Sequence, residues 1–268
     1  MRAWFIDETD AARPLVLEET EAPRPGIGEV LVDVQAVGVN RADLLQRKGA
    51  YPPPAGFDPR RPGLEYAGVV AAVGERVSLR KVSEPVMGLI GGGAYAEQIV
   101  VHERETITPP EGLNPAHAAA LPEAFLTAYR GLYLEAKLVP GQWALVRGAT
   151  SSVGMAALQL IHALGSQAIA TSRSQARLDA LNARFHELGL GAAFDLGVVD
   201  GAQGVAEQVV EQTGGAHLVL DFVGASVLKD NLAALRDEGR QVQIGVMGGM
   251  DARLNMGSFS CGVCRSWP

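Results

Sequence analysis

Residues 142–165, QWALVRGATSSVGMAALQLIHALG, decide the fold class of this 268-residue chain. Residues 143–146 form a short apolar run of the length typical of a buried parallel strand. Small residues follow from Gly148 to Gly154. Apolar side chains then recur at helical spacing until Gly165, a residue type that commonly ends a helix. The stretch therefore predicts a strand, a turn of small residues and a helix, in that order.

This order is typical of the start of a dinucleotide-binding βαβ unit. Small side chains let backbone N–H groups approach a pyrophosphate, and the positive end of the helix dipole faces it. The usual G-x-G-x-x-G would fall on Ala149, Ser151 and Gly154, so two of its three glycines are replaced. Taken alone, the turn also fits an ordinary strand–turn–helix. If it binds a cofactor, its pyrophosphate contacts are Ser151, Ser152, Val153 and Gly154.

The segment after this helix bears on the choice of cofactor. Residues 167–171 predict a second strand, and an NAD-binding unit would place Asp or Glu near its end, about 20 residues past the glycines. This chain has Ser172, Arg173 and Arg177 there. A carboxylate would repel a 2′-phosphate, whereas a hydroxyl and two guanidinium groups would hold it by charge-assisted hydrogen bonds. We therefore predict NADP(H) as the cofactor. The alternative is that both arginines merely lie on a solvated helix face.

The composition argues against several classes of partner. The chain is 47% hydrophobic and 20% charged, as is ordinary for a soluble globular protein. Its net charge of −7 argues against a nucleic acid or an anionic membrane as the main partner. We find no signal pattern and no apolar run that could span a bilayer, and expect a cytoplasmic protein. Cys261 and Cys264 lack the second pair that a zinc site would need, and we interpret them as free thiols.

Residues 1–123 are expected to form a small, mostly β domain. Residues 29–39 alternate between valine and other side chains, as in a half-buried strand. Residues 68–73 and 95–101 predict further strands. Clusters of Pro and Gly, such as 52–54 and 91–93, punctuate the segment. Short strands at turn-rich spacing are typical of such a domain.

From residue 124 to 258 the predicted helices and strands alternate. Beyond the elements already described, the patterns predict helices over 174–188, 205–213 and 226–236, and strands over 192–195, 218–221 and 241–245. Five strands connected in this way are typical of a doubly wound parallel sheet of the α/β class.

Four motifs spread over the chain identify a family. They are NRADLLQR at 40–47 with Gly49 and YPPP at 51–54, PGLEYAG at 62–68, LPEAFLTAY at 121–129, and the turn at 148–154. In order and spacing they resemble the quinone oxidoreductase branch of the zinc-free medium-chain dehydrogenase/reductases, the group that includes zeta-crystallin. The resemblance implies a GroES-like catalytic domain over residues 1–123 and a Rossmann NADP-binding domain over 124–258, with an active site between them.

The departures from zinc-dependent relatives bear on the chemistry. Those enzymes have Cys where this chain has Asn40 and His where it has Leu64, and they add a cysteine-rich lobe that is missing here. Neither replacement is a competent zinc ligand, so we predict no metal site. Without a Lewis acid, alcohol oxidation loses the group that stabilises an alkoxide. Hydride transfer to an electron-poor quinone or conjugated carbonyl needs only positioning and a hydrogen bond.

The resemblance assigns roles in the acceptor pocket to Asn40, Asp43 and Tyr51, with Asn40 and Tyr51 offering polar groups to the carbonyl. Each residue also has a structural interpretation. Asn40 could cap the following helix, Asp43 could pair with Arg47 at i,i+4, and Tyr51 could stiffen the Pro-rich loop.

Further cofactor contacts are expected at the carboxyl edge of the sheet, where ligands of doubly wound folds bind. Thr127 would touch the nicotinamide side, or else be a core-helix threonine. Two groups follow the fourth and fifth strands, and their alternative is ordinary loop structure. Phe222, Val223 and Gly224 would flank the adenosine half, and Val246, Met247 and Gly248 would meet the nicotinamide amide.

The sequence leaves three functions open. The first is a zinc-independent, NADPH-dependent reductase of quinones. The second is an NADPH-dependent reductase of alkenals or enones, an enoyl reductase, which shares nearly every motif above. The third is a cofactor-binding protein without catalytic activity.

The end of the chain departs from the family. The resemblance fades near Phe259, and residues 259–268 form an atypical tail. Full-length relatives are expected to be homodimers that pair through a sixth strand. We therefore expect a truncated or frame-shifted product whose sheet lacks its last strand, with an exposed sheet edge and marginal stability.

Overall fold

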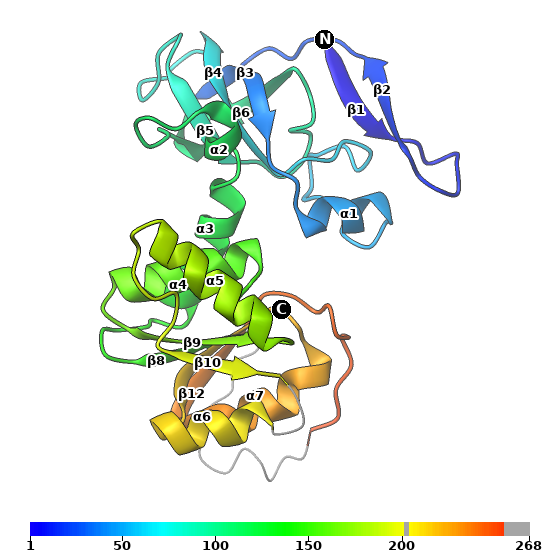
Figure 1. The fold of residues 1–268 in the computed structure, drawn as a ribbon. Helices are drawn as coiled ribbons and strands as arrows, with labels where there is room; N and C mark the ends of the chain where they lie inside the picture. The colour runs from blue at the N-terminus through cyan, green and yellow to red at the C-terminus, as the bar shows by residue number, and fades with distance from the viewer. Residues whose placement is uncertain (201–203, 255–268) are drawn as a thin grey trace. The chain divides into compact units, whose positions relative to one another are not determined.

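The chain divides into two compact units, Met1–Glu123 and Ala124–Pro268, in a computed structural model that describes residues 1–200 and 204–254 (Figure 1). The predicted tail at 259–268, with both cysteines, lies outside the described residues. None of the helices in the described ranges combines the length and apolar character that crossing a bilayer requires.

The first unit is built mainly from antiparallel strands. Its two sheets have the strand orders β1-β2 and β6-β3-β4-β5-β7. The strands are β1 (Arg2–Ile6), β2 (Leu15–Glu19), β3 (Glu29–Val37), β4 (Glu65–Val73), β5 (Pro85–Leu89), β6 (Gln98–His102) and β7 (Thr106–Ile107), and the helices are α1 (Arg41–Arg47) and α2 (Pro115–Ala118).

Alternation along the strands builds the core of this unit. Val30 and Val32 of β3 are fully buried and pack with Tyr66 and Val70 of β4, while Asp33, the next residue of the strand, is exposed. This period of two confirms the strand predicted over 29–39. The strand predicted over 68–73 begins three residues earlier, at Glu65.

The second unit alternates helices and parallel strands. The strands are β8 (Trp143–Val146), β9 (Gln167–Ser172), β10 (Leu196–Val199), β11 (Ala216–Asp221) and β12 (Leu235–Gln243). The helices are α3 (Pro122–Tyr129, which begins in the first unit), the π-helix Arg130–Glu135, α4 (Ser152–Ala163), α5 (Gln175–Glu187), α6 (Val205–Thr213) and α7 (Leu228–Ala234).

The strand order β10-β9-β8-β11-β12 confirms a doubly wound parallel sheet. The order reverses between β8 and β11, so the connections after these two strands diverge. Such a switch point leaves a crevice at the carboxyl ends of the strands, where ligands of this fold class bind.

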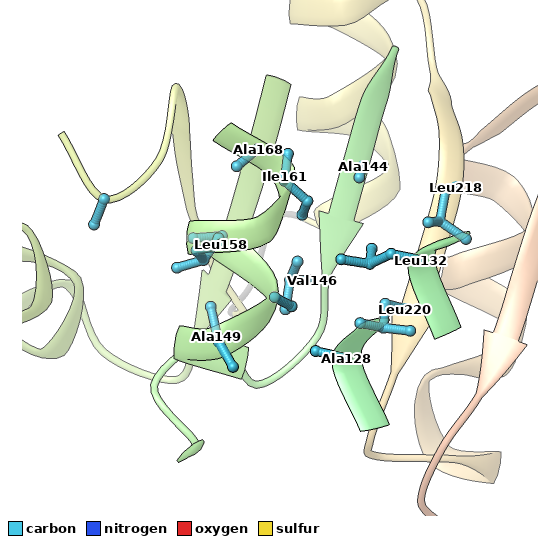
Figure 2. Close-up of a cluster of buried hydrophobic side chains, with 14 of the residues drawn as sticks. Ala128, Leu132, Ala144, Val146, Ala149, Leu158, Ile161, Ala168, Leu218 and Leu220 are labelled. Atoms are coloured by element: carbon cyan, nitrogen blue, oxygen red, sulfur yellow. The ribbon is translucent and has the colours of Figure 1, made fainter. Parts of the chain in front are cut away.

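Helices cover both faces of this sheet (Figure 1). Leu158 and Ile161 of α4 pack against Ala144 and Val146 of β8, together with α3 and α5 side chains (Figure 2). On the other face Leu145 packs against Val205 and Val209 of α6. Neighbouring β8 residues thus belong to opposite cores, as the alternation of a strand requires.

One element prediction in this unit is wrong, and one helix is shorter than predicted. The predicted strand at 192–195 is a connection, and β10 follows directly after it. The pattern misleads because Ala193 is fully buried, and the Asp195 carboxylate accepts a hydrogen bond from the N–H of Ala168 in β9 at 2.7 Å. The helix predicted over 226–236 ends at Ala234, because Leu235 already pairs with Ala216 in the β11–β12 ladder.

Candidate functional site

The small-residue turn sits at the switch point, between β8 and α4. Gly148 has φ +74, a conformation that favours glycine. Ser151 caps α4 by accepting a hydrogen bond from the Gly154 N–H at 3.1 Å. The turn is tied to β9, since Ala149 N–H donates to Thr171 O at 3.1 Å.

The geometry of the turn fits a pyrophosphate. In the described part of the chain, the N–H groups of Ser152 and Val153 donate to no acceptor. A helix N-terminus leaves such donors for caps, water or a ligand. A Cβ on Gly154 would lie 2.6 Å from Gly148 O, so only glycine permits this approach of helix and turn.

The end of β9 presents the residues predicted to choose the cofactor. Ser172 is buried as the last residue of the strand, whereas Arg173, just before α5, and Arg177, in its first turn, are exposed. Neither arginine forms an ion pair within residues 1–200 and 204–254. Both guanidinium groups therefore remain available to an anion.

The loops after β11 and β12 come together. Gly248 N–H donates to Val223 O at 2.6 Å, and Ala225 N–H donates to Gly249 O at 3.0 Å. A Cβ on Gly224 would lie 2.8 Å from Gly249 O. Phe222 is buried beneath them, while Val246 and Met247 are about half exposed. The predicted adenosine and nicotinamide loops thus form one surface at the carboxyl edge of the sheet.

In the first unit, Asn40 and Asp43 belong to one polar network, the Asn40 network, completed by Glu65 and Tyr95. Asn40 is the N-cap residue of α1, and its N–H donates to Asp43 Oδ2 at 2.7 Å. Its side-chain amide donates to Glu65 Oε1 at 2.8 Å. Asp43 also accepts from Gly63 N–H and from the Tyr95 hydroxyl. Among the ion pairs of the described residues there is none between Asp43 and Arg47, the alternative considered for Asp43.

Glu123 extends this network toward α3. Its N–H donates to Glu65 Oε2 at 2.8 Å. Burial, and then the charges of Glu65 and Asp43, raise the pKa of Glu123 to about 7. Burial also raises the pKa of Glu65, opposed by hydrogen bonds from Glu123 and Asn40. The first unit therefore holds carboxyl groups that take up protons more readily than ordinary glutamates.

We expect Glu123→Gln to flatten the pH dependence of stability. Because the pKa of Glu123 is higher in the folded state than in the unfolded state, its protonation stabilises the fold. This contribution is complete below about pH 4.5, the pKa of an ordinary glutamate, and is lost as pH rises through about 7. Relative to the variant, the wild type should lose on the order of 2 kcal/mol of unfolding free energy between pH 5 and 8. Urea unfolding at several pH values measures this, with the exposed Glu111→Gln as control. Parallel curves for wild type and Glu123→Gln would contradict it.

The two remaining predicted site residues, Tyr51 and Thr127, are both partly exposed. Tyr51 is 44% exposed in its loop. Thr127 is half-buried on α3 and lies outside the core cluster that contains Ala124 and Ala128. Within the described residues, no three His, Cys, Asp or Glu side chains gather closely enough to hold a metal ion.

Sequence reasoning missed Glu65, Tyr95 and Glu123. Glu65 and Glu123 lie within quoted motifs, but residues 58 positions apart meet only in the folded unit. It also missed Arg147, a fully buried arginine inside the stretch that decides the fold. A charged residue that ends an apolar run was the available signal, since a buried charge requires partners.

Comparisons with known proteins agree with both units. The family model described as "Alcohol dehydrogenase GroES-like domain" matches residues 26–111, and the one described as "Zinc-binding dehydrogenase" matches residues 152–262. The chain is 33% identical to "Quinone oxidoreductase-like protein 2" of Mus musculus, over 90% of this chain and 67% of that protein. It is 35% identical to "Synaptic vesicle membrane protein VAT-1 homolog" of Rattus norvegicus, but spans only 54% of that protein's length.

Solved structures are similar over nearly the whole chain. The quinone oxidoreductase of Pseudomonas syringae pv. Tomato DC3000 superposes with a TM-score of 0.81 at 29% identity, covering 99% of this chain and 81% of that one. The Escherichia coli quinone oxidoreductase, solved in complex with NADPH, superposes with a TM-score of 0.82 at 25% identity, and the match covers 99% of this chain and 81% of that one. The CurK enoyl reductase superposes with a TM-score of 0.83 at 26% identity, and the match covers 99% of this chain and 80% of that one.

These matches confirm the GroES-like and Rossmann fold and the family indicated by the motifs. The chain belongs to the quinone oxidoreductase-like branch of the medium-chain dehydrogenase/reductase superfamily, a family of oxidoreductases.

Proposed function

We propose that the protein is a zinc-independent, NADPH-dependent reductase of quinones. The observation that supports it most is the turn at the switch point, where the N–H groups of Ser152 and Val153 donate to no acceptor within the described residues and would be free to bind a pyrophosphate. The exposed Arg173 and Arg177, with Ser172, would hold the 2′-phosphate that distinguishes NADPH from NADH. NADPH, when bound, supplies the hydride.

The Asn40 network would orient the acceptor. A side-chain amide has two N–H donors, and Asn40 uses one on Glu65. The other, which has no partner within the described residues, would donate to an acceptor oxygen and stabilise the negative charge that grows there as hydride arrives. Glu65 fixes the rotation of the amide, and the exposed Tyr51 hydroxyl would offer a second donor.

The reaction is expected to need no metal. Asn40 and Leu64 occupy the positions of zinc ligands in zinc-dependent relatives, and neither is a competent ligand for zinc. Activity should survive EDTA, and elemental analysis should find no stoichiometric zinc in the purified protein. One equivalent of zinc per chain, lost together with activity on chelation, would contradict this part of the proposal.

An NADPH-dependent reductase of alkenals or enones is the second candidate, favoured by the similarity to the CurK enoyl reductase. A panel of benzoquinones, naphthoquinones and alkenals, assayed with NADPH at 340 nm, separates the two. The proposal expects quinones to be reduced faster than alkenals of similar size. The reverse order would favour the second candidate. Cofactor binding without turnover of any acceptor would favour a non-catalytic role.

A further inference from the structure

A buried arginine lies directly before the phosphate turn. Ala144 and Val146 of β8 face the α4 core, and Leu145 faces the α6 core. Alternation therefore places the side chain of Arg147 on the α6 side, beneath the carboxyl edge of the sheet. The side chain is only 1% exposed. A guanidinium so deeply buried is costly unless it is paired and hydrogen-bonded.

The partners of Arg147 come from two elements. Its Nη2 donates to Asp230 Oδ2, and its Nε donates to Asn231 Oδ1 at 2.5 Å; both partners lie on α7. Its Nη1 has no hydrogen-bond acceptor in the described residues and lies 3.7 Å from Asp200 Oδ1, just after β10. One side chain thus connects the ends of β8 and β10 with α7.

Asn231 transmits this connection to the loop after β11. It is fully buried, and because its Oδ1 accepts from Arg147, its Nδ2 points the other way and donates to Asp221 Oδ2 at 2.9 Å. Asp221, also fully buried, accepts from Val223 N–H at 2.6 Å and from Gly224 N–H at 3.1 Å. A relay therefore runs from the guanidinium through one amide and one carboxylate to two backbone N–H groups.

We propose that Arg147 is a positioning residue for the cofactor's adenosine half, acting through Asn231 and Asp221 on the loop at Phe222–Gly224. The inference rests on the proposed function for its ligand and on the relay for its geometry. Arg147 touches no part of the cofactor in this proposal. It fixes which way the Asn231 amide points, and thereby the shape of the loop.

A double-mutant cycle tests the relay with Arg147→Met, Asn231→Leu and the combined variant. Residues that act in series couple strongly, so the combined variant should bind adenosine 2′,5′-bisphosphate no more weakly than either single variant. Each single variant should bind it, and NADPH, about tenfold more weakly. If the loss of binding free energy in the combined variant equals the sum of the losses in the two single variants, the proposal is overturned.

Amide hydrogen exchange supplies a readout that does not depend on any cofactor. In Arg147→Met the N–H groups of Val223 and Gly224 should lose protection, while that of Gly154, held by Ser151, should not. Unchanged exchange at Val223 and Gly224 would overturn the proposal, even where NADPH binds. If the wild type binds neither nucleotide, the proposed function fails, and exchange alone decides the relay. If Arg147→Met does not fold, Arg147→Lys replaces it in both experiments, because lysine keeps the charge but cannot reach both α7 partners. The same changes in binding and exchange are expected for it, and the same results would overturn the proposal.

Discussion

Replacing Gly154 by alanine is expected to reduce NADPH affinity by roughly 100-fold, the largest effect of any single substitution considered. The added Cβ would lie 2.6 Å from Gly148 O and 2.8 Å from Ala149 Cα. Both are backbone atoms, so the turn or the start of α4 has to move. The N–H groups of Ser152 and Val153 then no longer converge, and charge-assisted hydrogen bonds of about 1.5–3 kcal/mol each are lost.

The same crowding should destabilise the second unit by about 1–3 kcal/mol. Fluorescence titration with NADPH and urea unfolding measure the two effects separately. Met155→Ala is the matched control, because it changes an exposed side chain on the adjacent position of α4. Wild-type affinity in Gly154→Ala would show that the turn does not bind the pyrophosphate.

Removing both exposed guanidinium groups, Arg173→Ala with Arg177→Ala, is expected to weaken NADPH binding at least about tenfold while NADH binding changes little. Only NADPH has the 2′-phosphate that these groups would hold by charge-assisted hydrogen bonds. Exposure to solvent reduces the effect below the sum of two such bonds in a buried site.

Titration of both cofactors at one fixed salt concentration gives the ratio of affinities. Arg184→Ala is the control, since Arg184 is also exposed on α5 but pairs with Glu187 at 3.0 Å. The assignment fails if the double variant loses affinity for NADH and NADPH equally, or for neither.

The local part of this architecture could be predicted from sequence because its signals are contiguous. The order of β8, turn and α4 follows from residue spacing within one stretch, and the switch-point position follows from the alternation of helices and strands. The strand at β10 could not be predicted, because the buried Ala193 gives the preceding connection an apolar pattern like that of a strand.

The polar networks could not be predicted, because their members are distant in sequence. Asp43, Glu65 and Glu123 meet around Asn40 only after β3 and β4 pair and α3 begins beside them. Arg147 is separated from Asn231 by 84 residues. Spacing rules describe one helix or strand at a time and contain no information on which distant elements pack together.

The most direct test of the central claim compares two reactions of the full chain in the presence of EDTA. The first is oxidation of NADPH at 340 nm on addition of 1,4-benzoquinone, and the second is reduction of NADP⁺ by a simple alcohol. The proposed function predicts enzyme-dependent NADPH oxidation by the quinone, faster than oxidation of NADH, and no reduction of NADP⁺. If quinone-dependent oxidation of NADPH is seen neither with EDTA nor without it, and the same preparation assayed without EDTA reduces NADP⁺ with the alcohol, the result would contradict it.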